Sequence, residues 1–89
     1  MSTLFVRHQV KAFDAWKLAY DAFDGERSKM GVTGQGVYQA IDNPNDVTVY
    51  HEFKNLEEAK AFVGSARLRE VMDEAGVVGE PTIWFTQRT

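Results

Sequence analysis

Hydrophobic and polar residues alternate near the start of the chain and then change to a helical spacing. Over residues 3–11 the even-numbered side chains form one largely apolar face, and this period of two predicts a strand. Over residues 13–30 the apolar and aromatic side chains recur every three, four or seven positions, which predicts a helix with one apolar stripe. We expect Asp14 to cap the start of this helix and Gly31 to end it in a left-handed turn.

The middle of the chain carries the signals of a β-hairpin. Residues 34–36, Gly-Gln-Gly, predict a flexible connector, and residues 37–41 predict a second strand. Residues 42–46 consist of Asp, Asn and Pro, a composition typical of a turn. Hydrophobic and polar residues alternate again over residues 47–53, so we expect the third strand there, joined to the second by this turn.

A second helical pattern follows the hairpin. Asn55, with a glutamate three residues later, forms a capping-box pattern that opens a helix. Gly64 and Ser65 interrupt the apolar stripe, and a serine can cap a fresh turn, so we expect the helix over residues 56–75 to be broken there. Residues 82–87 alternate once more and predict a fourth strand.

The order strand, helix, strand, strand, helix, strand indicates a four-stranded sheet with both helices on one face. Right-handed crossovers place the first and third strands side by side in the middle, where we expect them to run parallel. The other face then shows more aromatic rings than a monomer normally exposes, so we expect a homodimer through this face, with an ion pair of Arg7 and Glu52 at the interface. The residues of this face are Phe5, Arg7, Tyr38, Tyr50, Glu52 and Trp84.

Composition and charge narrow the function classes. Of 89 residues, 44% are hydrophobic and 26% charged, as in ordinary globular proteins, and we expect one domain over residues 1–89. A net charge of −3 without a cluster of Lys and Arg argues against nucleic-acid binding. The absence of Cys excludes disulfides and thiolate metal sites and fits a reducing cytoplasm. The longest apolar run near the start, residues 4–6, is too short for a signal peptide or membrane span, so we expect a cytoplasmic protein without membrane contact.

Several short motifs together resemble one known family. They are Val6-Arg7-His8, Phe13-Asp14-Ala15-Trp16-Lys17, His51-Glu52-Phe53, Leu56-Glu57-Glu58-Ala59, and then Phe62, Ser65, Leu68-Arg69-Glu70 and Met72. Over nearly the whole chain they resemble the antibiotic biosynthesis monooxygenase-like family of the dimeric α/β-barrel superfamily. The resemblance implies an α+β fold: a ferredoxin-like βαββαβ protomer with a four-stranded antiparallel sheet, helices on one face, and a dimer in which two sheets close a barrel.

The resemblance also implies a short list of activities. The superfamily includes cofactor-independent oxygenases of quinol-type substrates, haem-degrading oxygenases, polyketide cyclase-like proteins and lactone isomerases. The haem-degrading members carry a ligating histidine on the second helical region, where this chain has none, which disfavours haem degradation. We therefore expect no cofactor, and a small apolar or aromatic molecule as the ligand.

His8 and His51 are the only histidines and the main candidates for chemistry. If the central strands run parallel with Leu4 opposite Val47, the two imidazoles lie side by side on the helix-covered face. An imidazole that titrates near neutrality can remove a proton from a phenol or an activated carbon. Two histidines without a third nearby ligand rarely hold a catalytic zinc, so we expect no metal. The side chains expected to form the aromatic walls and to bind substrate are Trp16, Tyr20 and Phe62.

The same residues also fit a purely structural role. Two partly buried histidines can bond to each other, to Tyr20 or to water, and an aromatic helix stripe is most often core packing. Three hypotheses stand: a cofactor-independent monooxygenase or cyclase/isomerase acting on a small aromatic or polyketide-like molecule, a non-catalytic dimeric ligand-binding module, and a small structural partner of an enzyme. An enclosed cavity beside His8 and His51 would favour the enzyme, and a filled core the binding module.

Overall fold

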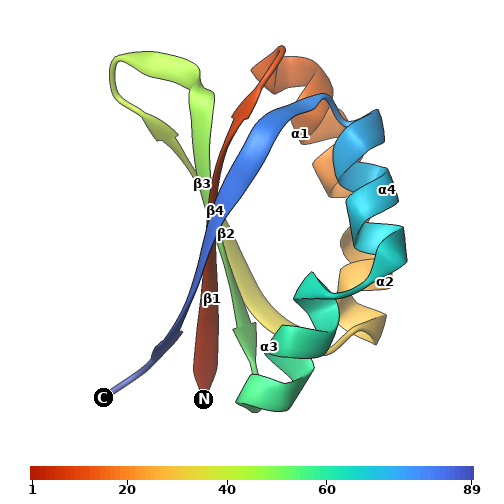
Figure 1. The fold of residues 1–89 in the computed structure, drawn as a ribbon, viewed down its shortest axis with the longest axis vertical. Coiled ribbons are helices and arrows are strands. Elements are labelled where there is room, and N and C mark those ends of the chain that lie inside the picture. Colours follow the sequence, from red (N-terminus) through yellow and green to blue (C-terminus); the bar gives the residue numbers. More distant parts are fainter.

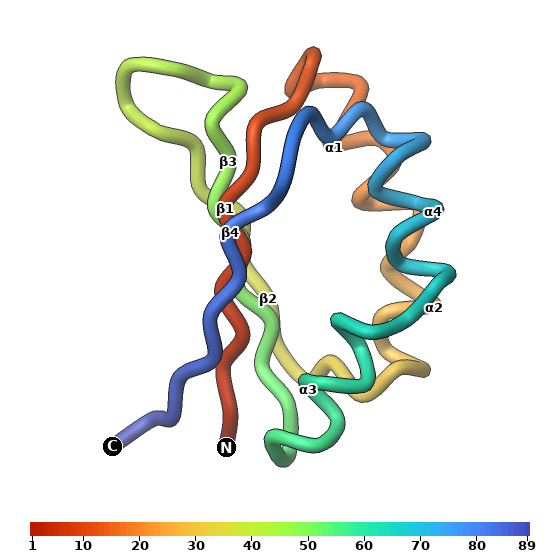
Figure 2. Tube along the Cα trace, in the orientation of Figure 1, coloured from red at the N-terminus to blue at the C-terminus, as the bar shows by residue number.

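The sheet and its helical layer are shown in Figure 1, a computed structural model that describes residues 1–89. All helices lie against one face of the sheet, and the other face is bare (Figure 1). The elements are β1 (Ser2–Val10), α1 (Phe13–Ala22), α2 (Asp24–Lys29), β2 (Val32–Ala40), β3 (Asn43–Phe53), α3 (Leu56–Val63), α4 (Ala66–Glu74) and β4 (Val77–Gln87). Both chain ends lie at the same end of the sheet (Figure 2). No helix combines the length and hydropathy of a membrane span.

The sheet has the strand order β2-β3-β1-β4, and every neighbouring pair is antiparallel. This arrangement confirms the ferredoxin-like α+β fold with helices on one face. The expectation of a parallel central pair is wrong, although β1 and β3 are neighbours as expected. The first helical region returns the chain so that β2 runs in the direction of β1. The hairpin then reverses the chain, so β3 between them is antiparallel to both.

Both helical regions consist of two shorter helices. In the second region, α3 ends at Gly64 and α4 begins after Ser65, whose hydroxyl oxygen accepts the Leu68 amide at 3.3 Å. The Asn55 side chain caps α3 in the same way and accepts the Glu58 amide at 2.9 Å. Each cap satisfies an amide that has no partner within its helix. The predicted break and the predicted Asn cap are therefore both confirmed.

The first helical region departs from the prediction in two ways. It is divided at Phe23 into α1 and α2 instead of forming one continuous helix. Asp14 lies inside the first turn and does not cap it. The Phe13 amide is satisfied instead by Oδ1 of Asn45, 3.0 Å away on β3. A side chain from a distant strand thus replaces the local cap, which no local motif reveals. Gly31 ends the region in a left-handed conformation, as expected, with φ at 99°.

The paired strands extend beyond the predicted ones. β3 begins at Asn43, inside the segment expected to be a turn, so that only Ile41 and Asp42 separate it from β2. β4 begins at Val77, directly after Gly76, whose φ of 88° lets the chain turn out of the helical layer. At the hairpin, pairing between β2 and β3 therefore overrides the local turn signal.

β2 includes the segment that was expected to be a connector. Gly34 and Gly36 lie within the strand, opposite Glu52 and Tyr50 of β3. A Cβ atom at Gly36 would overlap the Tyr50 ring, and one at Gly34 would lie 2.6 Å from the Glu52 carboxylate. The glycines therefore let side chains of β3 lie across the backbone of β2.

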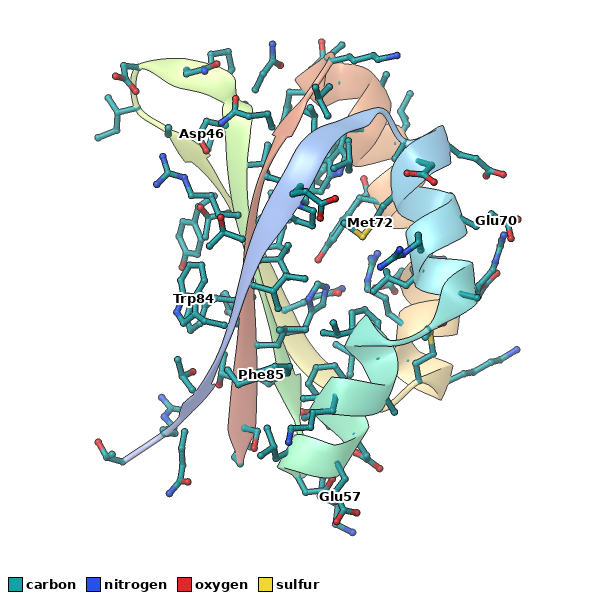
Figure 3. All side chains as sticks on the ribbon, in the orientation of Figure 1. Asp46, Glu57, Glu70, Met72, Trp84 and Phe85 are labelled. Carbon is teal, nitrogen blue, oxygen red and sulfur yellow. The ribbon has the colours of Figure 1, made fainter.

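The two faces of the sheet carry different side chains. The helix-covered face holds the core, which consists of Leu4, Val6, Val10, Trp16, Phe23, Val47, Val49, Phe53, Ala59 and Phe62. The bare face carries one aromatic ring from each strand, and we call these four rings the aromatic row. Phe5 stacks on Trp84 with centroids 5.4 Å apart and lies 6.2 Å from Tyr50, which in turn lies 6.2 Å from Tyr38. Figure 3 shows Trp84 on the side away from the helices.

A bidentate ion pair lies beside the aromatic row. Arg7 donates from Nε to Oδ1 of Asp46 at 3.0 Å and from Nη2 to Oδ2 at 2.6 Å. These hydrogen bonds lower the pKa of Asp46 and raise that of Arg7. The expectation that Arg7 pairs with Glu52 is therefore wrong: Arg7 pairs with Asp46 of the same chain.

The close approach at Gly36 predicts the effect of adding one methyl group. Gly36→Ala is expected to lower the free energy of unfolding by about 1–3 kcal/mol, because the Tyr50 ring must leave its place over β2. Gly25→Ala is the matched control: nothing lies within 4 Å of its Cβ in α2, so alanine should stabilise by up to about 1 kcal/mol. Urea denaturation measures both, and equal stabilities would contradict the predicted overlap.

Candidate functional site

A cavity of about 60 Å³ lies between the sheet and the helical layer. Strands β1 and β3 and all four helices contribute to its wall, which is mostly apolar. A space of this size has room for about four water molecules. The five residues proposed from the sequence all line it: His8, Trp16, Tyr20, His51 and Phe62. Trp16 and Phe62 are at the same time almost fully buried members of the core.

The two histidines share the helix-covered face but do not lie side by side. In the antiparallel register, His51 is opposite Leu4 and His8 is opposite Val47. They are therefore separated by four residues along the strand, which is about 13 Å at a rise of about 3.3 Å per residue. The expected adjacency is wrong because it depended on parallel strands. The structure brings both imidazoles to one cavity, at different ends.

His51 is a buried, neutral imidazole. It is 4% exposed, its Nε2 lies 3.5 Å from the Tyr20 hydroxyl oxygen, and its Nδ1 has no hydrogen-bond partner. Burial, and secondly the positive charge of Arg27, lowers its pKa to about 4. Both effects oppose a second positive charge in the cavity. His51 therefore has a free lone pair at neutral pH.

His8 is buried at the other end of the cavity. Neither of its ring nitrogens has a partner, and its ring centroid lies 5.5 Å from that of Trp16. Burial lowers its pKa as well. Buried polar atoms nearly always have a hydrogen-bond partner, so His8 is an exception among the buried side chains of this protein.

Arg27 is a functional candidate that the sequence reasoning missed. Its side chain is 3% exposed, although arginine is rarely buried unless it is paired. The guanidinium carbon lies 3.7 Å from the centre of the Tyr20 ring, and Nη1 donates to the Tyr20 carbonyl oxygen at 2.6 Å. The available signal was its place in phase with the apolar stripe of the helix. An arginine on that stripe faces the core, so its guanidinium must either be buried there or reach the solvent by bending of the side chain.

Arg27 belongs to a group that we call the polar cluster: Asp24, Arg27, Gln35 and the Tyr20 hydroxyl. Arg27 Nε donates to Gln35 Oε1 at 2.7 Å, and Nη2 lies 3.3 Å from Asp24 Oδ1. Gln35 Nε2 donates to the same Asp24 oxygen at 2.6 Å. The Tyr20 hydroxyl donates to Gln35 Oε1 at 3.2 Å, and burial raises its pKa. The cluster therefore satisfies a buried charge with a largely exposed carboxylate and neutral groups.

A larger groove of about 310 Å³ lies beside the cavity, between β4 and α4. Val6, Leu68 and Met72 line both spaces and so form the boundary between them. Figure 3 shows Met72 pointing from α4 toward the sheet, whereas Glu70 points away. A methionine side chain is flexible and changes conformation easily. Movement of Met72 would join the two spaces into one of the size that small-molecule ligands occupy.

The chemical groups of the cavity are two neutral imidazoles, one tyrosine hydroxyl and one guanidinium. This set can accept a proton and stabilise an anion. No three His, Asp or Glu side chains of the chain are grouped so as to hold a metal ion.

Comparison with known proteins finds similarity of structure but not of sequence. No protein-family model matches the chain, and no curated protein matches it significantly. A candidate antibiotic biosynthesis monooxygenase from Bordetella bronchiseptica has a TM-score of 0.84 at 13% identity, over 99% of this chain and 96% of that one. A second such protein, from Nitrosomonas europaea, has a TM-score of 0.76 at 18% identity, over 99% and 98% of the two chains.

SnoaB from Streptomyces nogalater, a cofactor-independent oxygenase, also has a similar structure. Its TM-score is 0.75 at 11% identity, over 99% of this chain and 94% of SnoaB. Identities this low show a shared fold, and one fold hosts many functions. The likeness expected from the sequence is thus confirmed at the level of the fold.

The buried imidazole of His51 predicts a specific pH dependence of stability. Above pH 6.5 His51 is neutral in the folded and unfolded states, and between pH 6.5 and about 4 only the unfolded state binds the proton. Acidification to pH 4 should therefore lower the free energy of unfolding by about 3 kcal/mol through this residue.

Urea denaturation of the wild type and of His51→Gln between about pH 7.5 and 4.5 measures this effect. Glutamine does not titrate, whereas His8 and the carboxylates contribute to both proteins alike. The variant should lose less stability on acidification. Parallel curves for the two proteins would contradict the burial of a neutral His51.

Proposed function

We propose that the cavity receives the reacting ring of a small aromatic molecule and that His51 removes a proton from it in a cofactor-independent oxygenase reaction. The observation that carries this proposal is the neutral, buried imidazole beside the Arg27 guanidinium in an apolar cavity. The imidazole is free to accept a proton, and the fixed cation favours the anion that remains. SnoaB, a cofactor-independent oxygenase with the same fold, supports the reaction class by analogy.

The proposed reaction needs a base, an apolar enclosure and molecular oxygen. Removal of a proton leaves the electron pair on an electron-rich aromatic anion, which can reduce oxygen directly. A carbon–oxygen bond forms, and the peroxide takes the proton back from the His51 imidazolium. The hydroperoxide then loses water, as its O–O bond and the C–H bond of the same carbon break to leave a carbonyl group. One oxygen atom enters the product and the other leaves as water. An apolar cavity protects the anion from protonation by solvent during these steps.

The groove between β4 and α4 provides the space that the cavity lacks. Ligand pockets usually have volumes of about 300–1,000 Å³, which the groove reaches and the cavity does not. We place the larger part of the substrate along Ile83 and Met72 in the groove, with its reacting ring inside the cavity. Trp16, Tyr20 and Phe62 then form the aromatic walls. His8 is the second polar contact and bonds a ligand oxygen at the far end.

A non-catalytic ligand-binding module is the second candidate. The observation that favours it is the low pKa of His51, about 4, because so weak a base removes protons inefficiently at neutral pH. In this case the cavity holds a small apolar ligand, and the histidines only donate or accept hydrogen bonds.

We also propose that the bare face of the sheet is buried against a second copy of the chain. Tyr38 is 61% exposed and Trp84 41% exposed in the single chain, within a row of four aromatic rings. A monomer seldom exposes so large an apolar patch. A twofold axis through this face would stack one aromatic row on the other.

The proposed base predicts the result of removing each histidine. His51→Ala should lower turnover of an oxidisable phenol or hydroquinone by about 10²–10⁴-fold, because proton removal loses its base. His8→Ala should chiefly raise KM, because the ligand loses a contact. Oxygen uptake measures turnover, and Leu18→Ala, an exposed position on α1, is the control.

Two results would overturn the oxygenase proposal. Full activity of the double variant H8A/H51A would mean that neither imidazole is the base. Failure of the wild type to oxidise any of a panel of phenols, quinols and anthrone-like compounds would favour the ligand-binding module.

The dimer proposal is tested by sedimentation or light scattering at micromolar concentration. The wild type should have twice the 10.1 kDa mass of the chain. Tyr38→Lys combined with Trp84→Lys should shift it to monomer, because buried unpaired cations oppose association. Leu18→Lys on α1 is the control. A monomeric wild type, or a dimer that the double substitution leaves intact, would contradict this interface.

A further inference from the structure

The Gln35 side chain has its orientation fixed from both ends. Its Nε2 donates to Asp24 Oδ1 at 2.6 Å, and its Oε1 accepts from Arg27 Nε at 2.7 Å. A guanidinium only donates and a carboxylate only accepts, so a flipped amide would place donor against donor and acceptor against acceptor. The amide oxygen of Gln35 therefore faces Arg27.

The Gln35 oxygen in turn directs the Tyr20 hydroxyl. The two oxygens are 3.2 Å apart, and only the tyrosine has a hydrogen to place between them. With that hydrogen committed to Gln35, the hydroxyl presents a lone pair to His51 Nε2, 3.5 Å away. This contact is long, but turning the hydrogen to Nε2 would leave two lone-pair-bearing oxygens facing each other at 3.2 Å. Nε2 is therefore the nitrogen that carries the hydrogen.

We infer that the polar cluster selects the His51 tautomer protonated on Nε2 and leaves Nδ1 as the nitrogen that accepts a proton from the substrate. A neutral imidazole carries one hydrogen, and the partner of one nitrogen decides which nitrogen bears it. Nδ1 is buried and has no partner in the chain. Tyr20 and Gln35 are thus positioning residues that act through His51. The role of Nδ1 rests on the proposed function, whereas the tautomer does not.

The tautomer decides whether the proton transfer can occur. In the assigned step the substrate O–H bond breaks, an N–H bond forms at Nδ1, and the electron pair stays on the substrate oxygen. The imidazolium so formed donates a stronger, charge-assisted hydrogen bond from Nε2 to the Tyr20 oxygen. In the opposite tautomer Nδ1 already bears a hydrogen and cannot accept another.

Three variants distinguish an effect on the His51 tautomer from a general effect on folding. Gln35→Leu removes the oxygen that holds the tyrosine hydrogen, so Tyr20 becomes free to donate to Nε2. Tyr20→Phe removes the acceptor of Nε2–H but leaves Arg27 and Gln35 paired. The double variant D24N/Q35E exchanges donor and acceptor: the new carboxylate accepts from Arg27 Nε and Tyr20, and the new amide donates to it. This exchange gives up the 3.3 Å contact of Arg27 Nη2 with residue 24.

The test is ¹⁵N NMR of the histidine ring nitrogens in the ligand-free protein at about pH 7.5, where both imidazoles are neutral. His8→Asn identifies the His51 signals. We expect an Nε2–H excess of about tenfold in the wild type and in D24N/Q35E. In Gln35→Leu the ratio should fall by about tenfold, and in Tyr20→Phe it should move toward that of free imidazole. An Nδ1–H signal in the wild type, or ratios unchanged in Gln35→Leu and Tyr20→Phe, would overturn the inference.

The tautomer measurement does not require turnover, so failure of the tautomer inference can be distinguished from failure of the oxygenase proposal. If the ratios change as expected and the wild type oxidises the panel, kcat should fall in Gln35→Leu and be restored in D24N/Q35E. If kcat does not follow the ratio, Nδ1 is not the accepting nitrogen. If the ratios change but no panel compound reacts, the cluster still sets the tautomer and only the oxygenase proposal fails.

Discussion

The antiparallel pairing of β1 with β3 is the contact on which the rest of the site depends. Because side chains alternate between the two faces, this register sends His8 and His51 to the helix-covered face and Phe5 to the bare one. A shift by one residue would exchange these sets. The same pairing spaces the imidazoles along the sheet, so each meets a different part of the helical layer. His51 lies beside Tyr20, and His8 lies beside Trp16.

A buried guanidinium sets the electrostatics of the interior. Removing Arg27 from water is costly unless hydrogen bonds replace its hydration, and Gln35, Asp24 and a backbone carbonyl do so. Asp24 is itself largely exposed, so its charge is screened while that of Arg27 is not. The interior therefore has a net positive character. Burial is the larger cause of the low pKa of His51, and this positive charge adds to it and would favour an anion over a cation as ligand.

The sequence was sufficient for the order of strands and helical regions, because hydrophobic periodicity is a local property. The two histidines could also be identified, since they fall on the apolar face of alternating strands. Their mutual placement could not, because strand direction depends on where the chain reverses. Gln35 was missed because its flanking glycines are typical of a loop, and only the neighbouring Tyr50 shows why small residues are needed there. Arg27 was missed because its partner within α2, Asp24, is three residues away, a spacing that is typical of exposed helix ion pairs and does not reveal a buried arginine.

The close fit of Tyr50 over Gly36 also constrains how this protein can diverge. The Tyr50 ring fills the space that a side chain at position 36 would take, so this ring position requires glycine there. Their effects are therefore non-additive, as expected for residues in direct contact. Relatives of this chain should change both positions together, and a bulky residue at 36 should accompany a small one at 50. Substitutions at this pair would also change the aromatic row, because Tyr50 lies between Phe5 and Tyr38. The sequence of the pair and that of the bare face should therefore change together.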